Sequence, residues 1–182
     1  MHFRNRPREP AMSIATRILL PPAILACGLA LSAPAGAATV YEYVNPAVAC
    51  QLSIPTTDTK VRPKASGYRN ESDSNGAFVI CGYGKPTSSS SITQINLTLL
   101  SMDGASHSVD CTAVSAVNGT NNTQKYVTKT AVVSGTNGIT VTWNPGDFGS
   151  TSGDIPFTPS PSVTCILPPQ TAITQVIDAY NQ

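Results

Sequence analysis

Residues 38–182 contain one histidine, His107, and its neighbourhood is the first place where catalytic chemistry can be sought. Asp103 and Asp110 lie close to it in the sequence, and serines are abundant. These residue types can form a Ser-His-Asp triad, in which the imidazole takes the proton of the serine hydroxyl. No G-x-S-x-G stretch or other nucleophile context accompanies them. We therefore interpret His107 as a strand-edge residue beside a turn, and we predict no catalytic residue.

The acidic residues offer two further kinds of chemistry. Glycoside hydrolysis needs two carboxylates that flank the scissile bond, but most acids here occur in turn contexts and nothing marks two as a pair. Residues 71–76 alternate oxygen-bearing side chains and end on Gly76, as an EF-hand loop begins, yet Gly82 occupies the twelfth position, where a bidentate Glu is needed. A hairpin turn is the favoured interpretation of 71–76. We expect neither a metal nor a cofactor.

Four cysteines after residue 37 predict two disulfides. They are Cys50, Cys81, Cys111 and Cys165, an even set with no C-x-x-C spacing for zinc or redox chemistry. Three pairings are possible. Because strands that are neighbours in sequence are often neighbours in space, Cys50–Cys81 and Cys111–Cys165 are the favoured pairs.

Aromatic residues could stack on a sugar. The set comprises Trp143, Tyr41, Tyr43, Tyr68, Tyr83 and Tyr126. A lone Trp on an alternating strand is typical of a core, so Trp143 is expected inside. Tyr83 lies between two glycines after a cysteine, which favours exposure. Tyr83 and Tyr68 are therefore the candidate ligand-contact residues.

The N-terminal segment has the pattern of an export signal. Four arginines precede the uncharged residues 18–41, whose most apolar part, residues 23–31, is too short to span a bilayer. The small residues 35–37 predict cleavage after Ala37, which removes Cys27, whether translation starts at Met1 or at Met12. A competing interpretation takes residues 24–28 as a lipobox in which Cys27 is lipidated. The predicted domains are a signal peptide, 1–37, and a mature domain, 38–182.

The charge of the mature domain argues against nucleic-acid binding. Removing four arginines and one glutamate from the 11 basic and 10 acidic residues leaves a formal net charge of −2. Nucleic-acid binding needs clustered Lys and Arg that release counterions. No membrane span is expected after cleavage.

Short strands separated by turn residues predict an all-β fold. The expected strands are residues 40–44, 60–62, 66–69, 77–82, 92–100, 107–113, 125–134, 139–143 and 162–167. Alternation places the following residues in the expected core: Ile95, Leu97, Leu99, Val109, Cys111, Ala113, Ile139, Val141 and Trp143, with Phe78 and Ile80. The number and regular spacing of these short strands predict a single two-sheet antiparallel β-sandwich that the two disulfides crosslink.

Turn residues suggest how the strands connect, and the tail is ambiguous. Residues 134–139 and 102–106 contain Asn-Gly or Asp-Gly and predict two hairpins. Residues 171–180 fit helical spacing as well as a strand, and the β character of the chain favours a strand.

These patterns together predict a non-catalytic exported structural or binding domain, secreted or periplasmic, whose partner is an extracytoplasmic protein or polysaccharide. Its specificity is not set by the sequence. The alternatives are a carbohydrate-binding module, a small secreted hydrolase that uses an Asp or His107, and, with a lipid on Cys27, an envelope lipoprotein.

Overall fold

The computed structural model describes residues 38–54, 60–84, 91–115, 124–156 and 161–181. The predicted signal peptide, Met12 and Cys27 lie outside these residues. No helix in the described ranges is long and apolar enough to cross a membrane.

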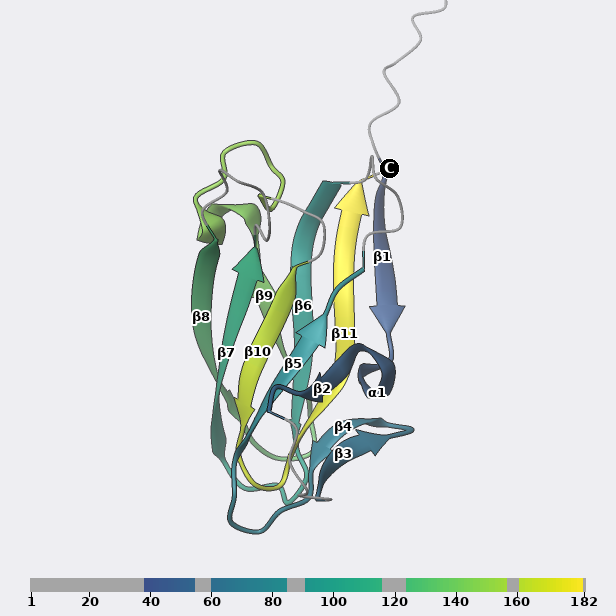
Figure 1. The fold of residues 1–182 in the computed structure, drawn as a ribbon, viewed down its shortest axis with the longest axis vertical. Coiled ribbons are helices and arrows are strands. Elements are labelled where there is room, and N and C mark those ends of the chain that lie inside the picture. The colour runs from purple at the N-terminus through teal and green to yellow at the C-terminus, as the bar shows by residue number, and fades with distance from the viewer. Residues whose placement is uncertain (1–37, 55–59, 85–90, 116–123, 157–160, 182) are drawn as a thin grey trace, which may run out of the picture. The chain divides into compact units, whose positions relative to one another are not determined.

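The described chain forms two antiparallel sheets, as predicted (Figure 1). Sheet A has the order β3 (Val61–Lys64), β4 (Gly67–Asn70), β11 (Thr171–Asn181), β6 (Ser91–Ser101) and β9 (Ile139–Trp143), and β1 (Thr39–Val44) also pairs with β11. Sheet B has the order β2 (Cys50–Leu52), β5 (Ala77–Gly82), β10 (Ser162–Leu167), β7 (His107–Ser115) and β8 (Lys125–Val133). Two short helices, α1 (Pro46–Ala49) and η1 (Pro145–Phe148), and strand β2 were not predicted.

Most of the expected core is confirmed. The alternating apolar residues of β6 and of β7 are fully buried between the sheets, as is Trp143 on β9. The indole Nε1 of Trp143 donates to the carbonyl oxygen of Val127 on β8 at 2.9 Å, which joins the two sheets at one side of the sandwich. On the same side, Lys129 Nζ donates to Thr142 O at 2.7 Å and so connects β8 with β9.

The expected inward positions on β5 are wrong. Val79 and Cys81 are buried, whereas Phe78 is 50% exposed and Ile80 is only partly buried. Both faces of this strand are apolar, so alternation alone does not identify the inner one. The disulfide from Cys81 to Cys50 fixes which face points inward. Ile139 is also more exposed than expected, at 38%.

The two predicted hairpins are wrong, because both turns carry the chain from one sheet to the other. Residues 102–106 join β6 in sheet A to β7 in sheet B, and residues 134–138 join β8 in sheet B to β9 in sheet A. Gly135 N donates to Gly104 O at 3.0 Å, so these two turns support each other. Met102 N donates to Gln170 O at 2.8 Å, which ties in the β10–β11 connection.

The predicted C-terminal strand is confirmed and lies at the centre of sheet A. β11 pairs with β6 along its length, and its opposite side is shared by β4 at one end and β1 at the other. β4 pairs with residues 171–173 and β1 with residues 176–181. Residues 174 and 175 therefore lie between the two partner strands, as the separation of β1 and β4 in Figure 1 illustrates.

Candidate functional site

The outer face of sheet B brings together exposed apolar and polar side chains from four strands. The registers place Phe78, Ile166, Asp110 and Thr130 in one row across β5, β10, β7 and β8. The next row contains Thr164, Thr112 and Thr128, and the third contains Val114 and Tyr126. Because side chains alternate along a strand, these residues all point away from the core. We call this set the outer face of sheet B.

This face contains a shallow hollow of about 260 Å³. Its lining residues are Phe78, Asp110, Thr112, Val114, Tyr126, Thr164 and Ile166. Phe78 is 50% exposed, Tyr126 62% and Ile166 43%. Exposure of large apolar side chains around one depression marks a binding surface more often than scattered exposed residues do.

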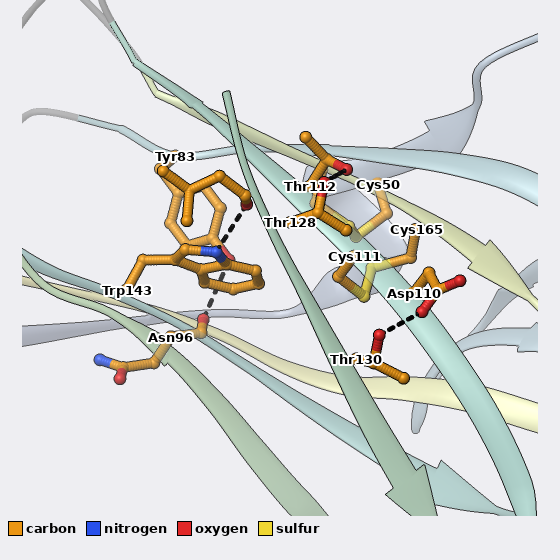
Figure 2. Close-up of a disulfide and its surroundings, with 12 residues drawn as sticks. Cys50, Tyr83, Asn96, Asp110, Cys111, Thr112, Thr128, Thr130, Trp143 and Cys165 are labelled. Atoms are coloured by element: carbon orange, nitrogen blue, oxygen red, sulfur yellow. Dashed lines mark hydrogen bonds between the residues drawn. A yellow bond between two sulfur atoms is a disulfide. The ribbon is translucent and has the colours of Figure 1, made fainter. Parts of the chain in front are cut away.

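Hydrogen bonds fix the polar side chains between these apolar groups. The Thr112 and Thr128 hydroxyls share a hydrogen bond of 2.8 Å, and Thr130 Oγ1 donates to Asp110 Oδ1 at 2.6 Å. Figure 2 shows both pairs. An ionised carboxylate has roughly four lone-pair sites, so Asp110 can accept further hydrogen bonds from a ligand. The face therefore offers apolar contact and oriented acceptors side by side.

Both disulfides lie directly behind this face. Cys50 pairs with Cys81 and Cys111 with Cys165, as predicted. Each disulfide joins two residues that are directly opposite on adjacent strands of sheet B, β2 with β5 and β7 with β10. The cysteines point into the core and alternate with the outward residues (Figure 2). Of the four strands that carry the outer face of sheet B, β7 and β10 are thus crosslinked to each other, and β5 is crosslinked to its edge neighbour β2.

The two tyrosines selected from the sequence are buried, so the expected exposure of Tyr83 is wrong. Tyr83 is 2% exposed and Tyr68 4%. The Tyr83 hydroxyl donates to Asn96 O on β6 at 3.0 Å, across the sandwich from β5 (Figure 2). Burial raises the pKa of both phenols, and that of Tyr83 well above its ordinary value, because the Asp178 carboxylate adds to the effect of burial. The flanking glycines of Tyr83 leave room for the chain but do not turn its ring outward.

Sequence reasoning included Tyr126 among the aromatics but did not select it, and it assigned Phe78 to the core. Alternation along β8 contained a signal for Tyr126. Tyr126 points to the same side of the strand as Thr128 and Thr130, which is the side opposite to the buried Ala131 and Val133. No comparable signal existed for Phe78, since both faces of β5 are apolar. Only the packing of the sheets identifies its face as the exposed one.

His107 interacts with a carboxylate, but the geometry differs from a triad. His107 Nε2 lies 2.8 Å from Asp103 Oδ1, and the Ser101 hydroxyl donates to the same oxygen at 2.9 Å. These contacts and the backbone N–H of Ala105 lower the pKa of Asp103 to about 2, the contact with His107 having the largest effect. In a triad the imidazole lies between serine and carboxylate, whereas here the carboxylate lies between the other two. This arrangement stabilises the turn from β6 to β7.

Residues 71–76 form the connection from β4 to β5 and so link sheet A to sheet B, which corrects the predicted hairpin. The Ser72 hydroxyl accepts hydrogen bonds from the backbone N–H groups of Ser74 and Asn75, at 3.3 and 3.0 Å. The Gln170 side chain donates to Ser72 O at 3.1 Å. Within the described ranges, no group of three or more His, Cys, Asp and Glu side chains is placed to hold a metal ion.

The core also contains a buried carboxyl group, that of Asp178. Asp178 lies on the inner face of β11, fully buried, opposite Glu42 on β1 and Ile95 on β6. Among the described residues, neither of its carboxylate oxygens has a hydrogen-bond partner. Burial, and next the nearby Glu42 carboxylate, raise the pKa of Asp178 to about 6. The folded domain therefore retains a proton there under mildly acidic conditions.

Comparison with known proteins identifies no family. No family model and no curated protein matches the sequence. Among solved structures, the fold is similar to a carbohydrate binding module from glycoside hydrolase family 9 (Cel9A) of Ruminococcus flavefaciens FD-1. The two chains are 17% identical, the alignment covers 57% of this chain and 82% of that one, and the TM-score is 0.38. At this TM-score and identity, the similarity carries no argument about the ligand of this chain.

Proposed function

We propose that this chain is a non-catalytic binding domain that contacts a polysaccharide through the outer face of sheet B. The observation that carries the proposal is the hollow of about 260 Å³ whose margin holds the exposed Phe78, Tyr126 and Ile166. A monomeric domain does not keep such residues around one depression without a cost in solubility, so a ligand that covers them is favoured.

The chemistry of this face suits a sugar. Pyranose rings present C–H groups on their faces and hydroxyls at their edges, so they need both apolar contact and hydrogen-bond partners. Phe78 and Tyr126 supply aromatic surface, and Asp110 supplies a carboxylate whose remaining lone pairs can accept hydrogen bonds from ligand hydroxyls. Because Asp110 is the only charged residue of this set, the face favours uncharged sugars over anionic ones.

The rigidity of the sheet supports the same function. The disulfide Cys111–Cys165 restrains β7 relative to β10, and Cys50–Cys81 restrains β5 relative to β2. A contact surface that is already ordered before binding loses less conformational entropy when the ligand arrives. The Tyr126 ring is itself restrained, because its hydroxyl donates to Gln124 Oε1, so Phe78 is the main aromatic side chain of this face that remains to be ordered.

The disulfides also support an extracytoplasmic location, because such bonds persist in oxidising compartments. With the signal peptide proposed for residues 1–37, the mature domain is secreted or periplasmic. Lipidation of Cys27 would instead hold the same domain at the envelope surface.

The test is retention on insoluble polysaccharides. The mature domain is mixed with cellulose, chitin, xylan and starch, and with polygalacturonic acid as an anionic comparison, and the bound fraction is measured. Tyr126→Ala and Phe78→Ala should each weaken retention about tenfold, because each removes an exposed aromatic contact. Tyr126→Phe should retain most of the affinity, since the ring is kept. Ile54→Ala is the matched control, an exposed apolar residue that lies outside this face.

Two results would contradict the proposal. The first is no retention of the parent domain on any polysaccharide of the panel. The second is retention that Tyr126→Ala, Phe78→Ala and Ile54→Ala all leave unchanged, since binding would then take place elsewhere.

A further inference from the structure

We infer that the opposite face of the sandwich carries a second contact surface for neutral saccharides, so that one domain bridges two polysaccharide chains. The surface is built from Tyr41 and Tyr43 on β1 with Gln94 on β6, which the buried Asn96 orients, and we call it the Tyr41–Tyr43 surface. The inference rests on the proposed function for the class of ligand, but its residues and its test are separate.

Two tyrosines stand on the outward side of β1. Tyr41 is 52% exposed and Tyr43 68%, and they alternate with the inward Glu42. Two residues along a strand span roughly 7 Å, so the side chains form a short row along the edge of sheet A. They lie opposite Ala179 and Ile177 of β11, which are almost completely buried. The exposed tyrosine rings therefore lie next to the buried apolar residues Ala179 and Ile177, which we call the apolar floor.

Beyond this floor lies a chain of oriented amides and hydroxyls. Asn96 pairs with Ile177 and Gln94 with Ala179. Thr142 Oγ1 donates to Asn96 Oδ1 at 2.7 Å, Asn96 Nδ2 donates to Gln94 Oε1 at 3.4 Å, and Gln94 Nε2 donates to Asn144 Oδ1 at 3.1 Å. Each carboxamide nitrogen has two N–H groups. One N–H of Gln94 is used in this chain of bonds, and because Gln94 is only partly buried, the other can donate to a sugar hydroxyl. Asn96 is only 6% exposed, so it orients Gln94 and does not itself contact the ligand.

A small cavity extends the surface beside Tyr43. Its volume is about 230 Å³, and Pro46, Ser66, Thr174 and Gln175 are among its lining residues. It forms because β1 and β4 share one side of β11 and leave residues 174 and 175 between them. Asn45 Nδ2 donates to Ala65 O at 3.2 Å and thereby holds the end of β1 to the β3–β4 hairpin.

The chemistry of this surface selects the ligand class. Tyr41, Tyr43 and Gln94 offer aromatic, hydroxyl and amide groups and no charge. A neutral polyhydroxylated ligand matches such groups, whereas an anionic polymer finds no countercharge among them. The two inner sheet faces pack roughly 10 Å apart, and the proposed surfaces lie on the outer sides. Each surface therefore engages a separate chain or a separate segment, and engagement of both increases retention through avidity.

The experiment compares four proteins: the wild type, Tyr43→Ala, Tyr126→Ala and the double variant. Retention on cellulose, chitin, xylan and starch is measured for each. A bridging assay then measures how much of a fluorescein-labelled soluble oligomer of the retained polymer is captured by protein already bound to the insoluble form. Tyr43→Phe, which keeps the ring, controls for loss of the tyrosine hydroxyl, and Ile54→Ala is again the surface control. Melting curves verify that each variant is folded.

Each single variant should lower retention about tenfold and abolish bridging, and the double variant should lose retention altogether. If Tyr126→Ala loses retention as completely as the double variant while Tyr43→Ala behaves as wild type, the second surface is refuted and the proposed function stands. If Tyr43→Ala alone abolishes retention and Tyr126→Ala has no effect, the proposed site on sheet B is refuted and so is bridging. If the wild type is not retained, both proposals are refuted.

Discussion

Replacing Asp178 with asparagine is expected to stabilise the domain at pH 8 much more than at pH 4. Asp178 is fully buried, neither of its oxygens has a hydrogen-bond partner among the described residues, and it faces Glu42 across the β1–β11 pair. Ionisation of such a group is unfavourable, because the protein interior solvates a charge poorly. Asparagine has nearly the same shape and stays neutral at every pH.

The magnitude follows from the raised pKa. The pKa of Asp178 is about 6 in the folded domain, against an ordinary value of 3.8. The gap is about 2 pH units, and each unit corresponds to ~1.4 kcal/mol, so the ionised side chain destabilises the fold by up to about 3 kcal/mol. The folded state holds the proton more tightly than the unfolded state. The stabilising contribution of the protonated carboxyl to the free energy of unfolding is therefore complete below pH 3.8 and is lost as the pH rises through 6. The wild type therefore loses stability across this window, and Asp178→Asn does not.

The assay is urea unfolding at pH 4, 5, 6, 7 and 8, followed by the fluorescence of the single tryptophan, Trp143. The measured quantity is the free energy of unfolding of Asp178→Asn minus that of the wild type. It should be about 2.5 kcal/mol larger at pH 8 than at pH 4, because a small part of the loss has already occurred at pH 4, just above 3.8. Any constant cost of burying the amide cancels in this comparison. Glu42→Gln should shift the transition toward lower pH, since the Glu42 carboxylate helps to raise the pKa of Asp178. Asp154→Asn serves as the matched control. A difference between Asp178→Asn and wild type that is the same at all five pH values would refute the reasoning.

Two further changes test how the fold is held together. A Cβ at Gly67 would overlap the carbonyl oxygen of Ile173, and φ there is +135°, so Gly67→Ala should lower the free energy of unfolding by about 3 kcal/mol or more. Gly104→Ala, also at positive φ but with nothing within 4 Å, should cost only about 1–2 kcal/mol, and equal costs in thermal unfolding would contradict this steric argument. Replacing Cys111 and Cys165 together by alanine should destabilise the domain by about 4 kcal/mol, because the disulfide closes a loop with a sequence separation of 54. A double variant with the chemical-denaturation midpoint of the wild type would show that this crosslink does not limit stability.

Many of the strands could be predicted because their signals are local. Residues 77–82, 139–143 and 162–167 alternate or are rich in β-branched side chains, and they coincide with β5, β9 and β10. The predicted cysteine pairs are confirmed, but the strands that they join are not consecutive in the chain: β3 and β4 come between β2 and β5, and β8 and β9 between β7 and β10. The terminal segment became a strand although its spacing also fitted a helix, since β11 has partners on both sides.

The candidate site was less accessible to sequence reasoning. A strand such as β5, with apolar residues at every position from Ala77 to Cys81, gives no sign of which face is exposed. Tyr83 was misplaced for a related reason, since flanking glycines permit many directions for a side chain. Its hydroxyl donates to the backbone carbonyl oxygen of Asn96, 13 residues away, and this contact holds the ring inside. Phe78 and Tyr126 were brought to one hollow only by the order of strands in sheet B.

By itself, the sequence determined that this chain makes many short strands, that the four cysteines after residue 37 pair, and where the chain turns. Only the tertiary structure decided which sheet each strand joins and which face of it meets solvent. The physical reason is that Asn-Gly and Asp-Gly reverse the chain whether the next strand pairs with the previous one or crosses to the other sheet. The choice is made by contacts between distant segments, such as Gly135 with Gly104 and Met102 with Gln170, and by the burial of Cys81 and Val79 in place of Phe78.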